Sequence, residues 1–226
     1  MLSEHFARKN SLFFLIQWLL LAVVMAVLVG SASALFLFSL DWATTTRLQH
    51  HWLILLLPFA GFAVGWIYLR VGRSVEAGNN LILEEVHSPA NTIPLRMAPL
   101  VFIGTVVSHL FGASVGREGT AVQMGASIAD RFTPLLGLDN DARRMVLMAG
   151  VSAGFSSVFG TPLAGAIFGL EVMAIGRMHY TAIFPCLVAA VVADQVGLMW
   201  GVHHTHYAMS SIPAVSAWTL AAVIVA

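Results

Sequence analysis

The sequence predicts an all-α integral membrane protein, a bundle of tilted and broken helices, and three observations support this fold class. Hydrophobic residues make up 58% of the 226 residues and charged residues only 10%, whereas about a quarter of an average soluble domain is charged. No charged residue occurs between Asn10 and Leu40, a stretch long enough to cross a bilayer at a tilt. Later in the chain, apolar helices too short to span a membrane begin at glycine turns. The chain is therefore expected to lie in the lipid bilayer.

The composition also argues against several classes of function. The formal net charge of +0 provides no basic field for nucleic acid, so no nucleic-acid partner is expected. The single cysteine, Cys186, lies in an apolar run and has no partner for an internal disulfide, so we interpret it as a buried thiol. We expect no enzyme activity, no cofactor and no bound metal.

The first two apolar stretches predict a hairpin of membrane helices. Residues 11–40 form a run much longer than the roughly 7–15-residue core of a signal peptide, so we expect a first, tilted transmembrane helix. A loop that contains Asp41 and Arg47 is expected next, and residues 52–69 are expected to form the second span.

Basic residues flank this hairpin at both ends. Arg8 and Lys9 precede the first span, and Arg70 and Arg73 follow the second. Such residues are enriched on the cytoplasmic side of membrane proteins. We therefore expect a multi-pass protein of the cell's inner (plasma) membrane, with a cytoplasmic N-terminus and the loop at 41–51 outside.

Beyond residue 74 the hydropathy breaks into shorter pieces, and glycine and proline separate them. The expected helices are a short one within residues 74–87, then residues 97–112, 118–132, 139–157, 163–175 and 180–200, and a last one that begins at Pro213 and is cut off at Ala226. The breaks are expected at Pro89, Pro94 and Pro99, at Pro134 and Gly137, and at Gly160, Thr161 and Pro162.

Two of these helices begin at polar glycine turns, at Gly78 and at Gly116. A helix that starts within the membrane is tolerated only where protein or a water-filled cavity surrounds the freed backbone groups. Its N-terminus has unpaired N–H groups and a partial positive charge of about half a unit, so it suits an anion. Anion transport is thus a candidate function from the residues alone.

The motif at the second turn consists of Gly116, Arg117, Glu118, Gly119 and Thr120, and it continues through residues 122–125. Together with residues 149–154 and 161–171, it resembles the CLC chloride channel and transporter family over residues 74–200. The resemblance implies two inverted repeats and, for a full-length protein, a homodimer with one pore per subunit. Residues 1–200 then correspond to the first repeat, and residues 212–226 to the start of a truncated second one.

Departures from the family pattern bear on the substrate. Ala77 replaces the serine that helps chloride-handling members hold chloride, and Thr120 replaces their usual proline. Both features are similar to the fluoride/proton antiporter branch. Val172 occupies the position at which many chloride/proton exchangers carry an inward-facing proton-transfer glutamate. The resemblance therefore implies fluoride export coupled to proton import, and the alternative is a chloride/proton exchanger or a passive chloride channel of the same family.

By the same resemblance, Glu118 is the gating glutamate, which occupies an anion position as a carboxylate and swings away when protonated. Asn79 and Asn80 either donate their amides to the anion or cap the following helix, and the two roles can coexist. For Arg117 we expect a pairing with a carboxylate or with backbone carbonyls more than direct anion contact. The predicted anion-binding residues are Ala77, Gly78, Asn79, Asn80, Gly116, Arg117, Gly119 and Thr120.

Several other residues carry weaker expectations. Glu84 and Glu85 are expected to face a cytosolic vestibule or to pair with Arg73 or Arg96. The glycine pairs expected at close helix contacts are Gly61 with Gly65, Gly112 with Gly116, and Gly150 with Gly154.

Among the remaining polar residues, His109 is expected to be buried with a backbone hydrogen bond. Glu171 either relays protons or pairs near the cytoplasmic end with Arg177. The group His203, His204 and His206 leaves open a membrane metalloenzyme. A non-transporting scaffold is the third alternative.

Overall fold

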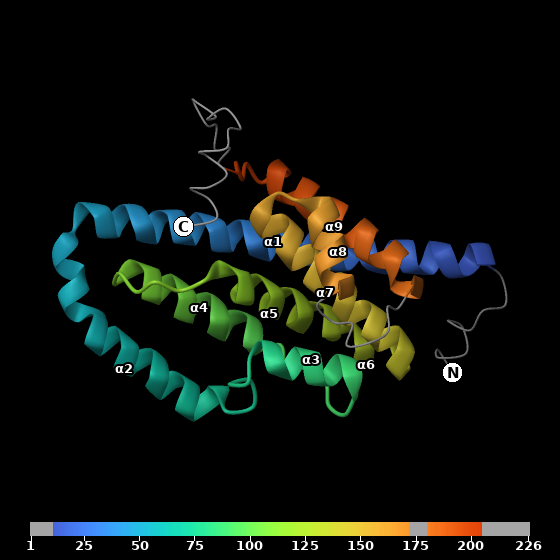
Figure 1. Cartoon of the computed structure of the whole chain (residues 1–226), viewed down its shortest axis with the longest axis horizontal. Helices are drawn as coiled ribbons and strands as arrows, with labels where there is room; N and C mark the ends of the chain where they lie inside the picture. The colour runs from blue at the N-terminus through green and yellow to red at the C-terminus, as the bar shows by residue number, and fades with distance from the viewer. Residues whose placement is uncertain (1–10, 172–179, 205–226) are drawn as a thin grey trace, which may run out of the picture.

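The computed structural model describes residues 11–171 and 180–204, and all regular secondary structure in these residues is helical. Figure 1 shows the helices as an elongated bundle. In chain order they are α1 Ser11–Gln49, η2 His51–Leu56, α2 Leu57–Ile67, η3 Tyr68–Gly72, α3 Asn79–His87, α4 Met97–Leu110, α5 Arg117–Asp130, α6 Phe132–Leu136, α7 Asn140–Phe159, α8 Pro162–Glu171, η4 Tyr180–Ala182 and α9 Ile183–Met199. The predicted all-α class is confirmed, and the helix expected from Pro213 lies outside the described residues.

Within the described residues, three helical segments are long and apolar enough to cross a membrane, namely Phe14–Gln49, His51–Gly72 and Tyr180–Met199. The first is longer than predicted, because α1 continues to Gln49 and contains Asp41 and Arg47. The prediction of a loop at residues 41–51 was therefore wrong. No glycine or proline interrupts residues 41–49, so the backbone can remain helical after the apolar run ends.

Two prolines expected in breaks lie inside helices instead. Pro99 is the third residue of α4, and Pro134 is the third residue of α6. The first turn of a helix has no intrahelical partner for its N–H groups, so proline is tolerated there. The predicted break at Gly160 is confirmed: its φ of +67° ends α7 in the left-handed conformation, and Pro162 begins α8.

The core surrounds α7, which contacts α1, α5, α8 and α9. Small residues allow the close approach of α5 and α7: a Cβ built on Gly150 would lie 2.6 Å from the carbonyl oxygen of Gly125. The close contact predicted at Gly150 and Gly154 is confirmed. The contacts predicted for Gly61, Gly65 and Gly116 were wrong, because a Cβ at each would meet nothing within 4 Å.

The bundle has two distinct ends. In Figure 1, the end of α1 and the loop between α4 and α5 lie at the left, and α3 and α6 lie at the right. The second span, which includes α2, lies at the edge of the bundle, with only 6% of its apolar window buried. The start of α5 follows the loop at the left, and α3 packs against α5.

Candidate functional site

The start of α3 depends on Gly78, which has φ +59° and ψ −123° and precedes the first helical residue. This conformation is one that only glycine adopts readily. Asn79 and Asn80 follow it as the first two residues of the helix. Because the N-cap position belongs to Gly78, the interpretation of the two asparagines as simple caps was wrong.

The start of α5 is built differently. Gly116 is the N-cap in an extended conformation, with φ −74° and ψ 139°, and Arg117 and Glu118 form the first helical turn. Both charged side chains are exposed. Glu118 therefore lies where the partial positive charge of the helix N-terminus favours its carboxylate form.

The two helix starts predicted from the glycine turns lie against each other. The side-chain amide of Gln123 donates to Oδ1 of Asn79 over 3.1 Å. A Cβ built on Gly119 would lie 3.4 Å from Nδ2 of Asn79, and one on Gly78 would lie 3.2 Å from Nε2 of Gln123. Glycine at both positions thus gives the two amide side chains room between the backbones.

A second link joins α4 to the first turn of α5. The hydroxyls of Thr105 and Thr120 lie 2.7 Å apart, and either can donate to the other. Both residues are buried. If Thr105 donates, the Thr120 hydroxyl retains its own hydrogen for a further acceptor.

Two cavities adjoin these helix starts. The small cavity, of ≈ 340 Å³, is lined by Tyr68, Glu76, Gly78, Thr105, Ser108, Gly119, Thr120 and Gln123, with apolar neighbours. The large cavity, of ≈ 750 Å³, is lined by Asp41, Thr44, His109, Arg117, Glu118, Phe159, His203 and His204, with apolar neighbours. Val115 and Gly116 line both cavities, so the segment before α5 separates them.

The predicted site residues divide between these cavities. Gly78, Gly119 and Thr120 line the small cavity, and Arg117 and Glu118 line the large one. Ala77, Asn79 and Asn80 line neither cavity, and Asn79 is tied to the small one through its hydrogen bond with Gln123.

The environment of Arg117 differs from the expectation. Its guanidinium carbon lies 5.3 Å from the centre of the Phe159 ring, a cation–π arrangement. Within the part of the chain that the structure describes, neither Arg117 nor Glu118 forms an ion pair. The expected pairing of Arg117 with a carboxylate was therefore wrong, and no ion pair restrains the Glu118 carboxylate there.

The histidine expectations have mixed outcomes. His109 is partly buried, and its Nδ1 lies 3.0 Å from the carbonyl oxygen of Thr105, which confirms the predicted backbone bond. Residues 11–171 and 180–204 contain no cluster of histidine, cysteine or acidic side chains suited to a metal ion. His206 lies outside the described residues, as do Val172 and Arg177, whereas Glu171 is exposed at the end of α8.

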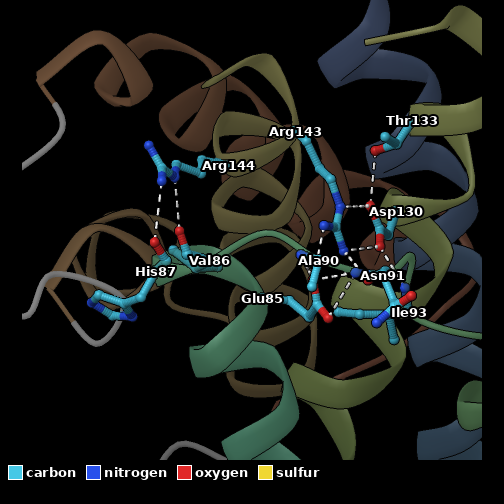
Figure 2. Close-up of polar contacts among 10 residues, drawn as sticks. All are labelled: Glu85, Val86, His87, Ala90, Asn91, Ile93, Asp130, Thr133, Arg143 and Arg144. Atoms are coloured by element: carbon cyan, nitrogen blue, oxygen red, sulfur yellow. Dashed lines mark hydrogen bonds and ion pairs between the residues drawn. The ribbon is translucent and has the colours of Figure 1, made fainter. Parts of the chain in front are cut away.

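A buried charged cluster, which the sequence did not reveal, holds the far ends of α3 and α5. Arg143 donates from Nη1 to Glu85 over 2.9 Å and from Nε and Nη2 to the two oxygens of Asp130, each over 2.9 Å. Nη2 also donates to the carbonyl of Asn91 over 2.6 Å. Figure 2 shows Arg143 reaching between the two carboxylates. We call Glu85, Asp130 and Arg143 the Arg143 cluster.

Both carboxylates of the Arg143 cluster are further satisfied by neighbouring donors. Glu85 accepts from the backbone N–H groups of Ala90 and Asn91, and Asp130 accepts from Ile93 N–H and the Thr133 hydroxyl (Figure 2). Glu85 is 5% exposed, Asp130 0% and Arg143 4%. Burial of charge at this level is stable only when it is paired and hydrogen-bonded.

The Arg143 cluster corrects one expectation from the sequence. Glu85 pairs with Arg143, not with Arg73 or Arg96, and Arg96 instead donates to the Ser74 hydroxyl over 2.7 Å. Glu84, the neighbouring carboxylate, is exposed. The acidic residue at the end of α5 and the arginine in the first turn of α7 were the available signals, but the sequence does not show that α3 lies beside them.

Comparisons with known proteins point to the same family that the sequence motifs resemble. The family described as voltage gated chloride channel matches residues 60–226. A "Chloride/fluoride channel protein" of Pseudomonas syringae pv. tomato is 62% identical over 213 residues, which are 94% of this chain and 47% of that protein. An "H(+)/Cl(-) exchange transporter ClcA" of Cronobacter sakazakii is 33% identical over 180 residues, which are 73% of this chain and 38% of that protein.

Solved structures agree with the family match. The crystal structure of a CLC-type fluoride/proton antiporter superposes with a TM-score of 0.86 at 32% identity, covering 96% of this chain and 55% of the other. A slow cyanobacterial Cl−/H+ antiporter shares the fold, with a TM-score of 0.73 at 21% identity over 92% of this chain. The chain spans about half the length of the relatives it matches. Because the family match extends over most of its residues, this chain belongs to the voltage gated chloride channel, or CLC, family.

Proposed function

We propose that the protein to which this chain contributes transports anions across a membrane, exporting fluoride in exchange for protons. The observation that carries the proposal is the hydrogen bond between Asn79, the first residue of α3, and Gln123, the seventh residue of α5. The segment before α5 separates the small cavity, which Gln123 lines, from the large cavity, which Glu118 lines. Two helix N-termini supply N–H donors and partial positive charge to one anion. Glu118 supplies a carboxylate that competes with the anion for these donors and binds a proton when displaced.

The amide of Asn79 favours a small anion. Its Oδ1 accepts from Gln123, and its Nδ2 lies 3.4 Å from a Cβ built on Gly119, so its two hydrogens are left for other acceptors. Fluoride holds its water tightly, and a site for it must replace that water with close, strong donors. The Asn79 amide, the Thr120 hydroxyl and the backbone N–H groups at the two helix starts form such a donor set. The names of the Pseudomonas relative and of the antiporter structure both include fluoride, which supports this choice.

The distribution of basic residues supports one orientation. The end of the bundle that contains α3, α6 and the start of α7 also holds most of the arginines, namely Arg70, Arg73, Arg96, Arg131, Arg143 and Arg144. The opposite end has Arg47 and Arg117. By the positive-inside tendency, the arginine-rich end is cytoplasmic and the large cavity opens outward. Since α1 starts at the arginine-rich end, the N-terminus is cytoplasmic, and we assign the protein to the plasma (inner) membrane.

The wider assembly follows from the family. We expect a homodimer in which each subunit has its own pore and combines two inverted repeats, of which residues 1–200 form the first. The Cronobacter relative is named as a chloride/proton exchanger, so chloride is the competing substrate.

Parallel efflux measurements test the substrate. The full-length protein is reconstituted into liposomes loaded with equal fluoride and chloride, and release of each anion is followed with an ion-selective electrode. The proposal predicts faster fluoride release, accompanied by proton uptake. Chloride release that exceeds fluoride release would contradict the assignment of fluoride, and release of either anion without proton movement would identify a passive channel.

A further inference from the structure

Several titratable side chains line the large cavity in addition to Glu118, the proposed gating carboxylate. Asp41 contributes from α1, His109 from α4, and Arg117 and Glu118 from α5. His203 and His204, which follow α9, are the other titratable residues among the described lining. Within the described residues the lining thus includes two carboxylates and one guanidinium, so with neutral histidines their net charge is −1 (two negative and one positive side chain). Such a cavity attracts protons toward Glu118.

The hydrogen bond of His109 fixes which of its nitrogens is available for chemistry. Nδ1 lies 3.0 Å from the carbonyl oxygen of Thr105. A carbonyl oxygen only accepts, so Nδ1 carries the hydrogen and the lone pair of the neutral ring belongs to Nε2. His109 therefore takes up a proton at Nε2 and keeps its orientation when it does so.

The backbone that orients His109 is itself tied to the helix that carries Glu118. The Thr105 hydroxyl lies 2.7 Å from the Thr120 hydroxyl, two residues after Glu118 in α5. Both threonines are buried, and both also line the small cavity. His109 and Glu118 are thus held at one cavity by a short connection between α4 and α5.

The other groups near α4 define its electrostatic surroundings. From α1, Asp41 lines the cavity, and the Cδ of Arg47 lies 3.5 Å from a Cβ built on Gly112. The α2 segment Leu57–Ile67 contains no charged residue, and from η3 the Tyr68 ring lies 3.7 Å from a Cβ built on Gly104, on the side of the small cavity. Asp41 is therefore the one described carboxylate, other than Glu118, that shares the large cavity with His109.

We infer that His109, assisted by Asp41, relays protons through the large cavity to Glu118. Nε2 of His109 accepts a proton from water of the outer solution, and the imidazolium passes it to a carboxylate oxygen of Glu118, directly or through one water. The histidine returns to its neutral form, and the protonated Glu118 leaves the anion position. Asp41 stabilises the transient imidazolium. This relay rests on the proposed fluoride/proton exchange, because it supplies the protons for that exchange.

Proton uptake driven by outward fluoride movement tests the relay in liposomes that contain the full-length protein. His109→Gln keeps a polar side chain but has no titratable nitrogen, and we expect proton uptake to fall by about tenfold or more. His50→Gln is the matched control, because Nδ1 of His50 makes the same kind of bond, 3.1 Å to the carbonyl of Thr46, but His50 lines neither cavity. External imidazole is expected to restore uptake in His109→Gln, a rescue that a purely structural histidine would not show.

Asp41→Asn provides a second variant that does not alter α4. We expect a several-fold loss of proton uptake that external imidazole also restores. Uptake in His109→Gln equal to that of His50→Gln would overturn the relay alone, as would losses in both cavity variants that imidazole does not restore. Fluoride efflux without proton uptake in the unaltered protein would overturn the proposed exchange and the relay together.

Discussion

The side-chain amide of Gln123 donates to Oδ1 of Asn79, and this 3.1 Å bond joins residues 44 positions apart, the seventh residue of α5 and the first residue of α3. The bond orients the Asn79 amide, because its oxygen is engaged and its nitrogen is left with both hydrogens. A residue that looks like a helix cap in the sequence thus accepts a hydrogen bond from the neighbouring helix.

Loss of this bond is expected to weaken fluoride binding. Gln123→Leu removes the donor and lets the Asn79 amide rotate, and a net hydrogen-bond contribution of about 1 kcal/mol corresponds to roughly a fivefold loss of apparent fluoride affinity. Fluoride efflux at a series of internal concentrations measures this change. Asn80→Ala is the comparison, since Gln123 donates to Asn79 and not to Asn80. A larger loss in Asn80→Ala than in Gln123→Leu would show that the wrong asparagine has been assigned.

The Arg143 cluster is expected to dominate the stability of this half of the protein. Arg143→Met leaves Glu85 and Asp130 buried without their cation, and removal of one partner of a buried pair costs about 3–5 kcal/mol. Arg143→Lys is expected to recover only part of this loss, because one ammonium cannot reproduce the planar fork that contacts both carboxylates. The free energy of unfolding in detergent, from denaturant titration, measures both variants.

Arg144→Met is the matched control for the Arg143 variants. Arg144 is the adjacent arginine; it pairs with the exposed Asp141 and donates to the carbonyls of Val86 and His87, so its loss removes hydrogen bonds but leaves no buried carboxylate unpaired, and a smaller destabilisation than for Arg143→Met is expected. Equal destabilisation by the Arg143→Met and Arg144→Met changes would contradict the assigned role of the Arg143 cluster.

The contact between α5 and α7 is expected to tolerate no methyl group at Gly150. A Cβ there would lie 2.6 Å from the carbonyl oxygen of Gly125, so Gly150→Ala must push the two backbones apart, at a cost of about 1–3 kcal/mol or more. Gly61→Ala adds the same methyl in α2, where nothing lies within 4 Å, and is expected to be neutral or stabilising. The thermal unfolding midpoints of the two variants in detergent test this difference. A lower midpoint for Gly61→Ala than for Gly150→Ala would contradict the close packing at Gly150.

Much of the fold could be predicted from the sequence because membrane helices leave strong local signals. A transmembrane helix was predicted from the long apolar run before Leu40. Helix boundaries were predicted from the breaks at Gly78, Gly116 and Gly160. Element ends were less predictable. Polar residues such as Asp41 do not end a helix by themselves, and a proline such as Pro134 is compatible with a first turn.

The candidate site was predictable only in part, for a physical reason. The motif around Glu118 and the turn at Gly78 are local, so their residues could be named in advance. The links between them are not local: Gln123 reaches Asn79, Thr105 reaches Thr120, and the Arg143 cluster joins three helices. Side-chain partners at such separations depend on how the helices pack, which a single sequence does not specify.

The most direct test of the account concerns the Glu118 carboxylate itself. Glu118→Gln retains the shape of the side chain but cannot bind and release a proton. In liposomes with the full-length protein and an outward fluoride gradient, we expect this variant to lose proton uptake against a proton gradient. Glu84→Gln, a change at an exposed glutamate that lines neither cavity, should behave like the unaltered protein. Uphill proton uptake by Glu118→Gln at the unaltered rate would contradict the assignment of Glu118 as the group that couples the two ions.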